Sequence, residues 1–75
     1  MSTTFEQSRA AELVALTQVA ETIRTAATLD DLHAASAQAV DRLQGALRDN
    51  VISGFDYLGW AKRLDAAEAE RRAEL

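Results

Sequence analysis

The chain has 75 residues, a net charge of −4 at pH 7, no cysteine and one histidine, His33. So short a chain forms at most one domain, here residues 1–75, and a single copy can hide little apolar surface. With no disulfides and one histidine, we expect helix packing or self-association to supply its stability. The lack of cysteine also fits a protein of the reducing cytoplasm.

Acidic and basic residues are mixed along the whole sequence, with five acids and four bases even in residues 51–75. Direct binding of nucleic acid requires clustered Lys and Arg, so we do not expect this class of partner. No apolar run approaches the roughly 18 residues of a membrane span, and the N-terminus lacks a basic start before an apolar segment. We therefore do not expect a membrane protein or a visible targeting signal.

The composition predicts an all-α protein. Proline is absent, alanine is abundant, and no segment alternates apolar and polar residues as a strand does. We expect three helices, at about residues 4–27, 29–49 and 54–73, packed as an antiparallel hairpin or small bundle. The rival is a single helix running through Thr28, because neither Gly nor Pro marks that joint.

Short capping motifs mark the expected helix starts, each with a hydroxyl that can accept a hydrogen bond from a free backbone N–H. The candidate caps are Thr3 with Glu6 or Thr4 with Gln7, then Thr28 before Asp30 and Asp31, then Ser53 with Asp56. Asn50 suits a left-handed helix end, and Val51 and Ile52 can fold onto the helix that follows. The glycine- and aromatic-rich stretch at residues 49–60 is thus explained as a corner, without a ligand.

The first two helices each carry one apolar stripe at helical spacing, which predicts one buried face per helix. In the first helix the stripe comprises Phe5, Leu13, Leu16, Val19, Ala20, Ile23 and Ala27. In the second it comprises Leu29, Leu32, Ser36, Ala39, Val40, Leu43, Ala46 and Leu47. Gly45 interrupts the second stripe and is interpreted as a close approach to a neighbouring helix.

The third helix has apolar residues on two sides, in arcs about 140° apart. Phe55, Leu58 and Ala61 form one arc, while the other comprises Tyr57, Trp60, Leu64 and Ala67. A single copy can bury only one of these arcs. We expect the Phe55 arc to face inward and the Trp60 arc to face solvent, as an interface. Beyond Leu64 the helix is expected to be a solvated end, with an ion pair between Glu68 and Arg72.

Two patterns resemble chemical sites, but each has a simpler explanation. Asp30, His33 and Ser36 share a helix face, yet a serine in mid-helix has no free backbone N–H groups for an oxyanion hole. The same Asp and His make only half of a bundle metal site. We therefore expect no catalysis, no bound metal and no cofactor.

The sequence favours a binding role over an enzymatic one. We expect a small acidic helical module that forms a homodimer through Tyr57, Trp60, Leu64 and Ala67 and also binds or inhibits another protein. Regulators of mobile-element or phage type are one class of such modules, although fold alone does not give function. The alternative is an oligomer that binds a nucleotide-like ligand through Tyr57, Trp60 and Arg63.

Overall fold

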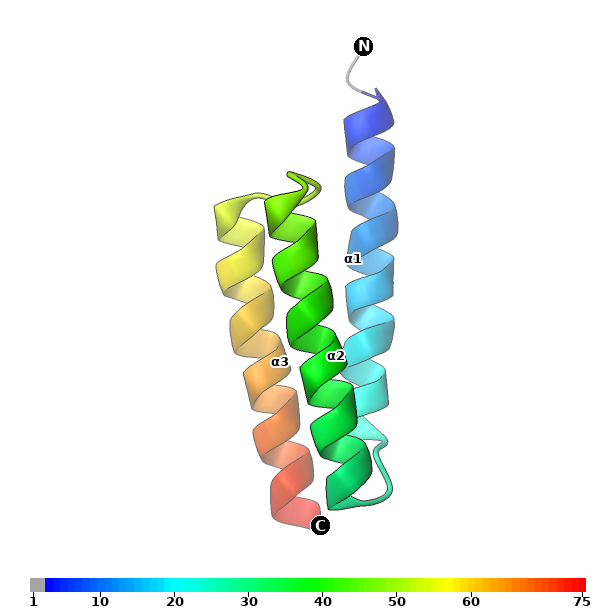
Figure 1. The fold of residues 1–75 in the computed structure, drawn as a ribbon, viewed down its shortest axis with the longest axis vertical. Coiled ribbons are helices and arrows are strands. Elements are labelled where there is room, and N and C mark those ends of the chain that lie inside the picture. The colour runs from blue at the N-terminus through cyan, green and yellow to red at the C-terminus, as the bar shows by residue number, and fades with distance from the viewer. Residues whose placement is uncertain (1–2) are drawn as a thin grey trace.

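The computed structural model describes residues 3–75, which form three helices joined by short turns. The helices are α1 (Thr3–Arg24), α2 (Leu29–Arg48) and α3 (Gly54–Glu74), and they run up and down as a three-helix bundle (Figure 1). The bundle is a rod of 47 × 17 × 15 Å. Within the described residues there is no strand, so the all-α prediction with three helices is confirmed.

The turn between α1 and α2 separates them fully, so the rival prediction of one continuous helix is wrong. α1 ends at Arg24, three residues before the expected end, and Ala26 in the turn is buried. Thr28 has extended backbone, with φ −135°, and its hydroxyl accepts a hydrogen bond from the Asp31 N–H at 3.0 Å. This cap confirms the predicted start of α2, since it satisfies a backbone donor that the first helical turn leaves free.

The corner between α2 and α3 forms as predicted. Asn50 has a left-handed backbone, with φ 59°, which lets the chain leave α2. Ser53 and Asp56 then form a capping box, in which each side chain accepts from the other residue's backbone N–H. Ile52 lies buried just before this cap and fixes the angle at which α3 enters the bundle.

The first turns of α1 project beyond the corner of α2 and α3 (Figure 1). Phe5 lies on the α1 face that packs against the bundle lower down, yet it is 53% exposed, because no neighbouring helix reaches that height. The expectation that Phe5 is buried is therefore wrong. Thr4 lies inside α1 and does not cap it, whereas the predicted pairing of Thr3 with Glu6 depends on the Thr3 side chain, which lies outside the described part of the chain.

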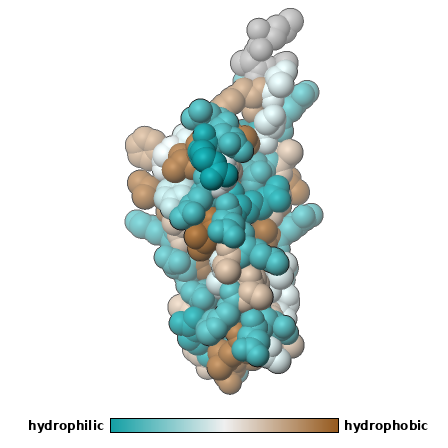
Figure 2. Space-filling view, viewed as in Figure 1, coloured by the Kyte–Doolittle hydropathy of each residue, from teal (hydrophilic) through white to brown (hydrophobic). Residues whose placement is uncertain are grey.

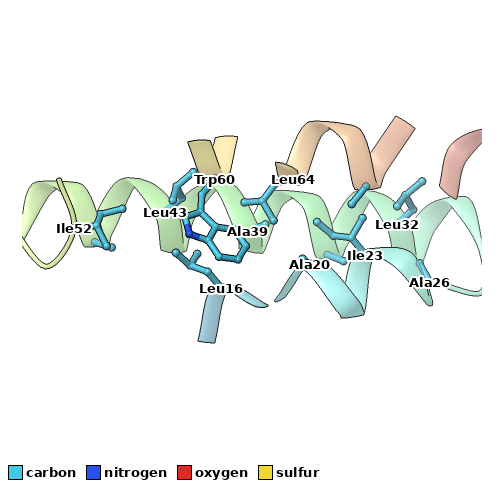
Figure 3. Close-up of a cluster of buried hydrophobic side chains, with 13 residues drawn as sticks. Leu16, Ala20, Ile23, Ala26, Leu32, Ala39, Leu43, Ile52, Trp60 and Leu64 are labelled. Carbon is cyan, nitrogen blue, oxygen red and sulfur yellow. The ribbon is translucent and has the colours of Figure 1, made fainter. Parts of the chain in front are cut away.

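The core runs through the bundle as one cluster to which all three helices contribute (Figure 3). It comprises Leu16, Ala20, Ile23, Ala26, Leu32, Ala35, Ala39, Leu43, Ala46, Ile52, Trp60, Leu64 and Ala67. The Trp60 indole points into the bundle, toward Leu16 of α1 and Leu43 of α2 (Figure 3). Because it is the largest side chain in the cluster, Trp60 is a main contributor of buried area.

The apolar stripes of α1 and α2 are only partly buried. After α1, Ala26 is buried and the expected Ala27 is exposed. In α2, Ala35 is buried, whereas the outer members of the predicted stripe, Leu29, Val40 and Leu47, are exposed. α2 packs against two helices, and its alanines let both backbones come close, so the buried arc centres on small residues. Gly45 does not mark a close approach, because a Cβ there would meet only the Arg48 guanidinium, at 3.6 Å.

Candidate interaction surface

The orientation of α3 is the reverse of the expected one. Trp60, Leu64 and Ala67 are buried in the bundle, with only 9% of Trp60 exposed, and Tyr57 is half-buried. Of the arc that was expected inside, Phe55 and Leu58 face solvent, and only Ala61 is half-buried against the core. Of the interface predicted at Tyr57, Trp60, Leu64 and Ala67, the last three residues are therefore core, and only Tyr57 keeps part of its side chain at the surface.

The reason for this orientation lies further along the helix. At about 100° per residue, the Trp60 arc continues through Leu64 and Ala67 and stays apolar for the length of the core. The Phe55 arc instead runs into Lys62 and Asp65, and burying those unpaired charges would cost more than burying Phe55 gains. This signal is present in the sequence and predicts the observed orientation.

The side of α3 that points away from α1 and α2 carries the two most exposed large apolar residues of the described chain. Phe55 is 89% exposed and Leu58 is 60% exposed. They lie three positions apart, and so on neighbouring turns of one face. We call this face the outer stripe of α3; its members, all exposed, are Phe55, Leu58, Lys62, Asp65, Ala66, Ala69 and Ala73.

The upper end of the outer stripe is apolar and shallowly hollowed. Gly54, Phe55, Tyr57 and Leu58 line the hollow, and none of them is charged. Figure 2 shows apolar surface at its upper left edge, where Figure 1 places the start of α3. Polar surface separates this apolar area from others lower on the same view (Figure 2).

An ion pair beside this end fixes the first turn of α3 against α1. The Arg9 guanidinium donates two hydrogen bonds to the Asp56 carboxylate, at 2.9 and 2.8 Å. The same carboxylate accepts from the Ser53 backbone N–H in the capping box, at 3.2 Å. Hydrogen bonds from Arg9 hold the pKa of Asp56 well below its usual range, and the carboxylate in turn raises the pKa of Arg9. The ion pair therefore positions the start of α3 against α1.

The predicted ligand platform of Tyr57, Trp60 and Arg63 is not an open one. The Arg63 guanidinium stacks on the Trp60 ring, 4.9 Å from its centroid, in a groove that Arg9, Leu13 and Phe55 help to line. Because the ring is buried and Arg63 lies over its face, no free aromatic face remains for a base to stack on. A ligand would have to displace Arg63 first.

The residues considered for catalysis and metal binding do not come together. Asp30 and His33 are exposed, and the Ser36 hydroxyl is buried without a hydrogen-bond partner. Between residues 3 and 75, no three His, Cys, Asp or Glu side chains gather in a way that could hold a metal ion. No helix in that range is both long and apolar enough to cross a membrane.

The end of α3 is more firmly held than the sequence predicts. The Arg71 Nε donates a 2.7 Å hydrogen bond to the Ala26 carbonyl, so the last turns of α3 are tied to the turn after α1. The predicted ion pair of Glu68 with Arg72 is present at 3.0 Å. A long-range bond to a backbone carbonyl has no sequence pattern, and therefore the role of Arg71 could not be predicted.

No protein-family model matches the chain, and no curated protein or solved structure matches it significantly. The functional argument therefore depends on the surface of the molecule itself.

Proposed function

We propose that this protein is a helical protein–protein interaction module that self-associates and binds a protein partner through the outer stripe of α3. The observation that carries this proposal is the exposure of Phe55 and Leu58 together on one helix face, beside an uncharged hollow. Single apolar residues on a surface are ordinary, but a contiguous apolar patch usually marks an interface. Aromatic side chains are also enriched at such sites.

The fold itself gives no reason for these two side chains to be apolar. Both point away from the core, and the capping box and the Arg9 ion pair already hold the first turn of α3 in place. A polar residue at either position would leave the bundle intact. A role in which the module holds its partner inactive, as a regulator does, stays a prediction of the sequence.

The test replaces the patch without touching the core. Phe55→Ser combined with Leu58→Ser should leave the helix content of the protein unchanged but reduce both its sedimenting mass and its capture of a partner by a tagged copy. The matched control is Val14→Ser, which changes an apolar residue on α1 that is as exposed as Leu58. If the double variant associates like the control, the outer stripe of α3 is not an interaction surface.

The alternative, binding of a nucleotide-like ligand, makes a different prediction. Displacement of Arg63 from Trp60 would change the surroundings of the only tryptophan, so nucleotides would shift its fluorescence with no change in mass. We expect no such shift, because the ring lies in the core and its neighbouring cation is already in place.

A further inference from the structure

The outer stripe of α3 is divided into a half with large residues and a half with small ones. Phe55 and Leu58 lie in its first turns, whereas Ala66, Ala69 and Ala73 lie in its last turns. Two such stripes fit together if they run antiparallel, because the large side chains of each copy then face the small ones of the other. In a parallel pair, large residues would meet large ones and the small ends would leave a gap.

The charges in the middle of the stripe support the same arrangement. Lys62 and Asp65 are exposed, and within residues 3–75 neither side chain makes a hydrogen bond or ion pair. An antiparallel pair about a two-fold axis midway between them brings each Lys62 beside the Asp65 of the second copy, twice over. The flanking Arg72 already has a partner in Glu68 and does not oppose this contact.

We propose that α3 pairs antiparallel with α3 of a second copy, about a two-fold axis that passes between Lys62 and Asp65. This inference rests on the proposed function in taking the outer stripe as the interaction surface, and it adds the partner and the register. In this register Leu58 packs on Ala69 of the second copy, and Phe55 reaches the end of the helix at Ala73. The two bundles then lie on opposite sides of the paired α3 helices, since α1 and α2 pack on the face of α3 opposite to the outer stripe.

The spacing of the stripe fits such a pair. Phe55, Leu58, Lys62, Asp65 and Ala69 follow one another at intervals of three and four residues, as in helices that pack side by side over several turns. One helix-on-helix contact lies at the small end of specific interfaces, near roughly 1,000 Å² of buried surface in total. We therefore expect a dimer of roughly micromolar affinity that exchanges with the monomer.

The first experiment measures association by analytical ultracentrifugation over a range of protein concentrations up to millimolar. The wild type should shift from monomer to dimer, and Ala69→Glu should remain monomeric, because a glutamate fills the space that Leu58 of the other copy needs. Ala37→Glu, at an exposed alanine of α2, should dimerise as the wild type does. Circular dichroism confirms that each variant keeps its helix content, which both substitutions should allow.

The second experiment tests the register through its charges. Lys62→Glu and Asp65→Lys should each weaken the dimer, by roughly tenfold, because each places like charges across the axis. Mixing the two single variants in equal amounts should restore dimerisation, since both cross-axis pairs are then of opposite charge. The double variant carrying both changes should also dimerise. Weakening without recovery in the mixture would overturn the register.

The third experiment tests the direction with disulfides, which the cysteine-free chain makes simple. In an antiparallel pair the two copies of residue 58 lie about 16 Å apart along the helix, at 1.5 Å per residue, too far for a disulfide. Leu58→Cys alone should therefore not cross-link on oxidation, nor should Ala69→Cys alone, whereas a mixture of the two should. Cross-linking of Leu58→Cys with itself would show a parallel pair and overturn the proposal.

These outcomes separate the pairing from the function on which it rests. If Phe55→Ser with Leu58→Ser abolishes association while Ala69→Glu leaves it intact, the apolar patch is an interaction surface but the antiparallel pairing is wrong. If the wild type remains monomeric at millimolar concentration, both the pairing and the self-association in the proposed function are wrong.

Discussion

The Arg9 guanidinium and the Asp56 carboxylate form a two-bond fork that joins α1 to the first turn of α3, 47 residues away in sequence. Asp56 also belongs to the capping box of α3, so one carboxylate both starts the helix and ties it to its neighbour. Charge-assisted, two-pronged bonds of this kind are the most directional that side chains make. The fork therefore joins the first turn of α3 to α1 in the orientation that buries Trp60 and exposes Phe55.

The fork predicts a dependence of stability on pH. Because hydrogen bonds from Arg9 lower the folded-state pKa of Asp56 below its unfolded value of about 3.9, its contribution is complete above that pH. The contribution is lost as the pH falls from there toward the folded-state pKa. Asp56→Asn should thus be less stable than the wild type at neutral pH, and the difference should shrink in acid.

Urea unfolding followed by circular dichroism, repeated from neutral pH down into acid, measures this difference. Asp41→Asn is the control, since Asp41 is exposed and has no ion pair in the described part of the chain. A gap between wild type and Asp56→Asn that stays constant down to strongly acid pH would contradict the role given to the fork.

The reversed orientation of α3 predicts opposite results for two of its three aromatic residues, Trp60 and Phe55. Trp60→Ala removes the largest core side chain and should cost about 3–5 kcal/mol of stability, a large share of what a small domain has. Phe55→Ser changes an exposed side chain and should stay within about 0.5 kcal/mol when measured at low protein concentration. Denaturant midpoints of the two variants decide the matter, and equal losses would mean that Phe55 is buried.

Local sequence signals predicted the helices and their caps because these depend on neighbouring residues. Thr28 and Ser53 cap where expected, and Asn50 turns the chain as its small polar side chain allows. The rotation of α3 was missed because apolar spacing alone does not say which of two arcs is buried. The decisive information was the position of Lys62, which interrupts one arc. Contacts such as Arg71 with Ala26 depend on the assembled bundle and have no local signature.

Arg71 and Arg72 are adjacent, yet they should differ in their contribution to stability. The Arg71 side chain is mostly buried and donates to the Ala26 carbonyl, whereas Arg72 makes a largely exposed ion pair with Glu68. Arg71→Gln should cost about 1 kcal/mol, because it leaves that carbonyl without its charged donor. Arg72→Gln should cost less than about 0.5 kcal/mol. Thermal unfolding of the two variants side by side tests the contact, and equal effects would argue against it.

The two glycines that lie in helix interiors, Gly45 and Gly59, should both be replaceable by alanine with a gain in stability. A Cβ at Gly59 would meet nothing within 4 Å, and one at Gly45 would meet only the flexible end of Arg48. Alanine is the better helix former by about 1 kcal/mol, so Gly45→Ala and Gly59→Ala should each raise the unfolding temperature. A loss of stability in Gly45→Ala would instead indicate that a neighbouring helix packs closely against Gly45.

The hydroxyl of Ser36 is buried on α2 with no hydrogen-bond partner, which makes it a cost to the fold. Ser36→Ala removes this unsatisfied group and also improves helix propensity, so it should stabilise the protein by about 1 kcal/mol. In a domain of this size such a gain raises the unfolding temperature by about 4–8 °C.

Ser53→Ala should do the opposite and cost about 1 kcal/mol, because the Ser53 hydroxyl caps α3. Calorimetry of the two serine variants should therefore show shifts of the unfolding temperature in opposite directions. Destabilisation by Ser36→Ala would mean that the Ser36 hydroxyl has a hydrogen-bond partner, such as a bound water.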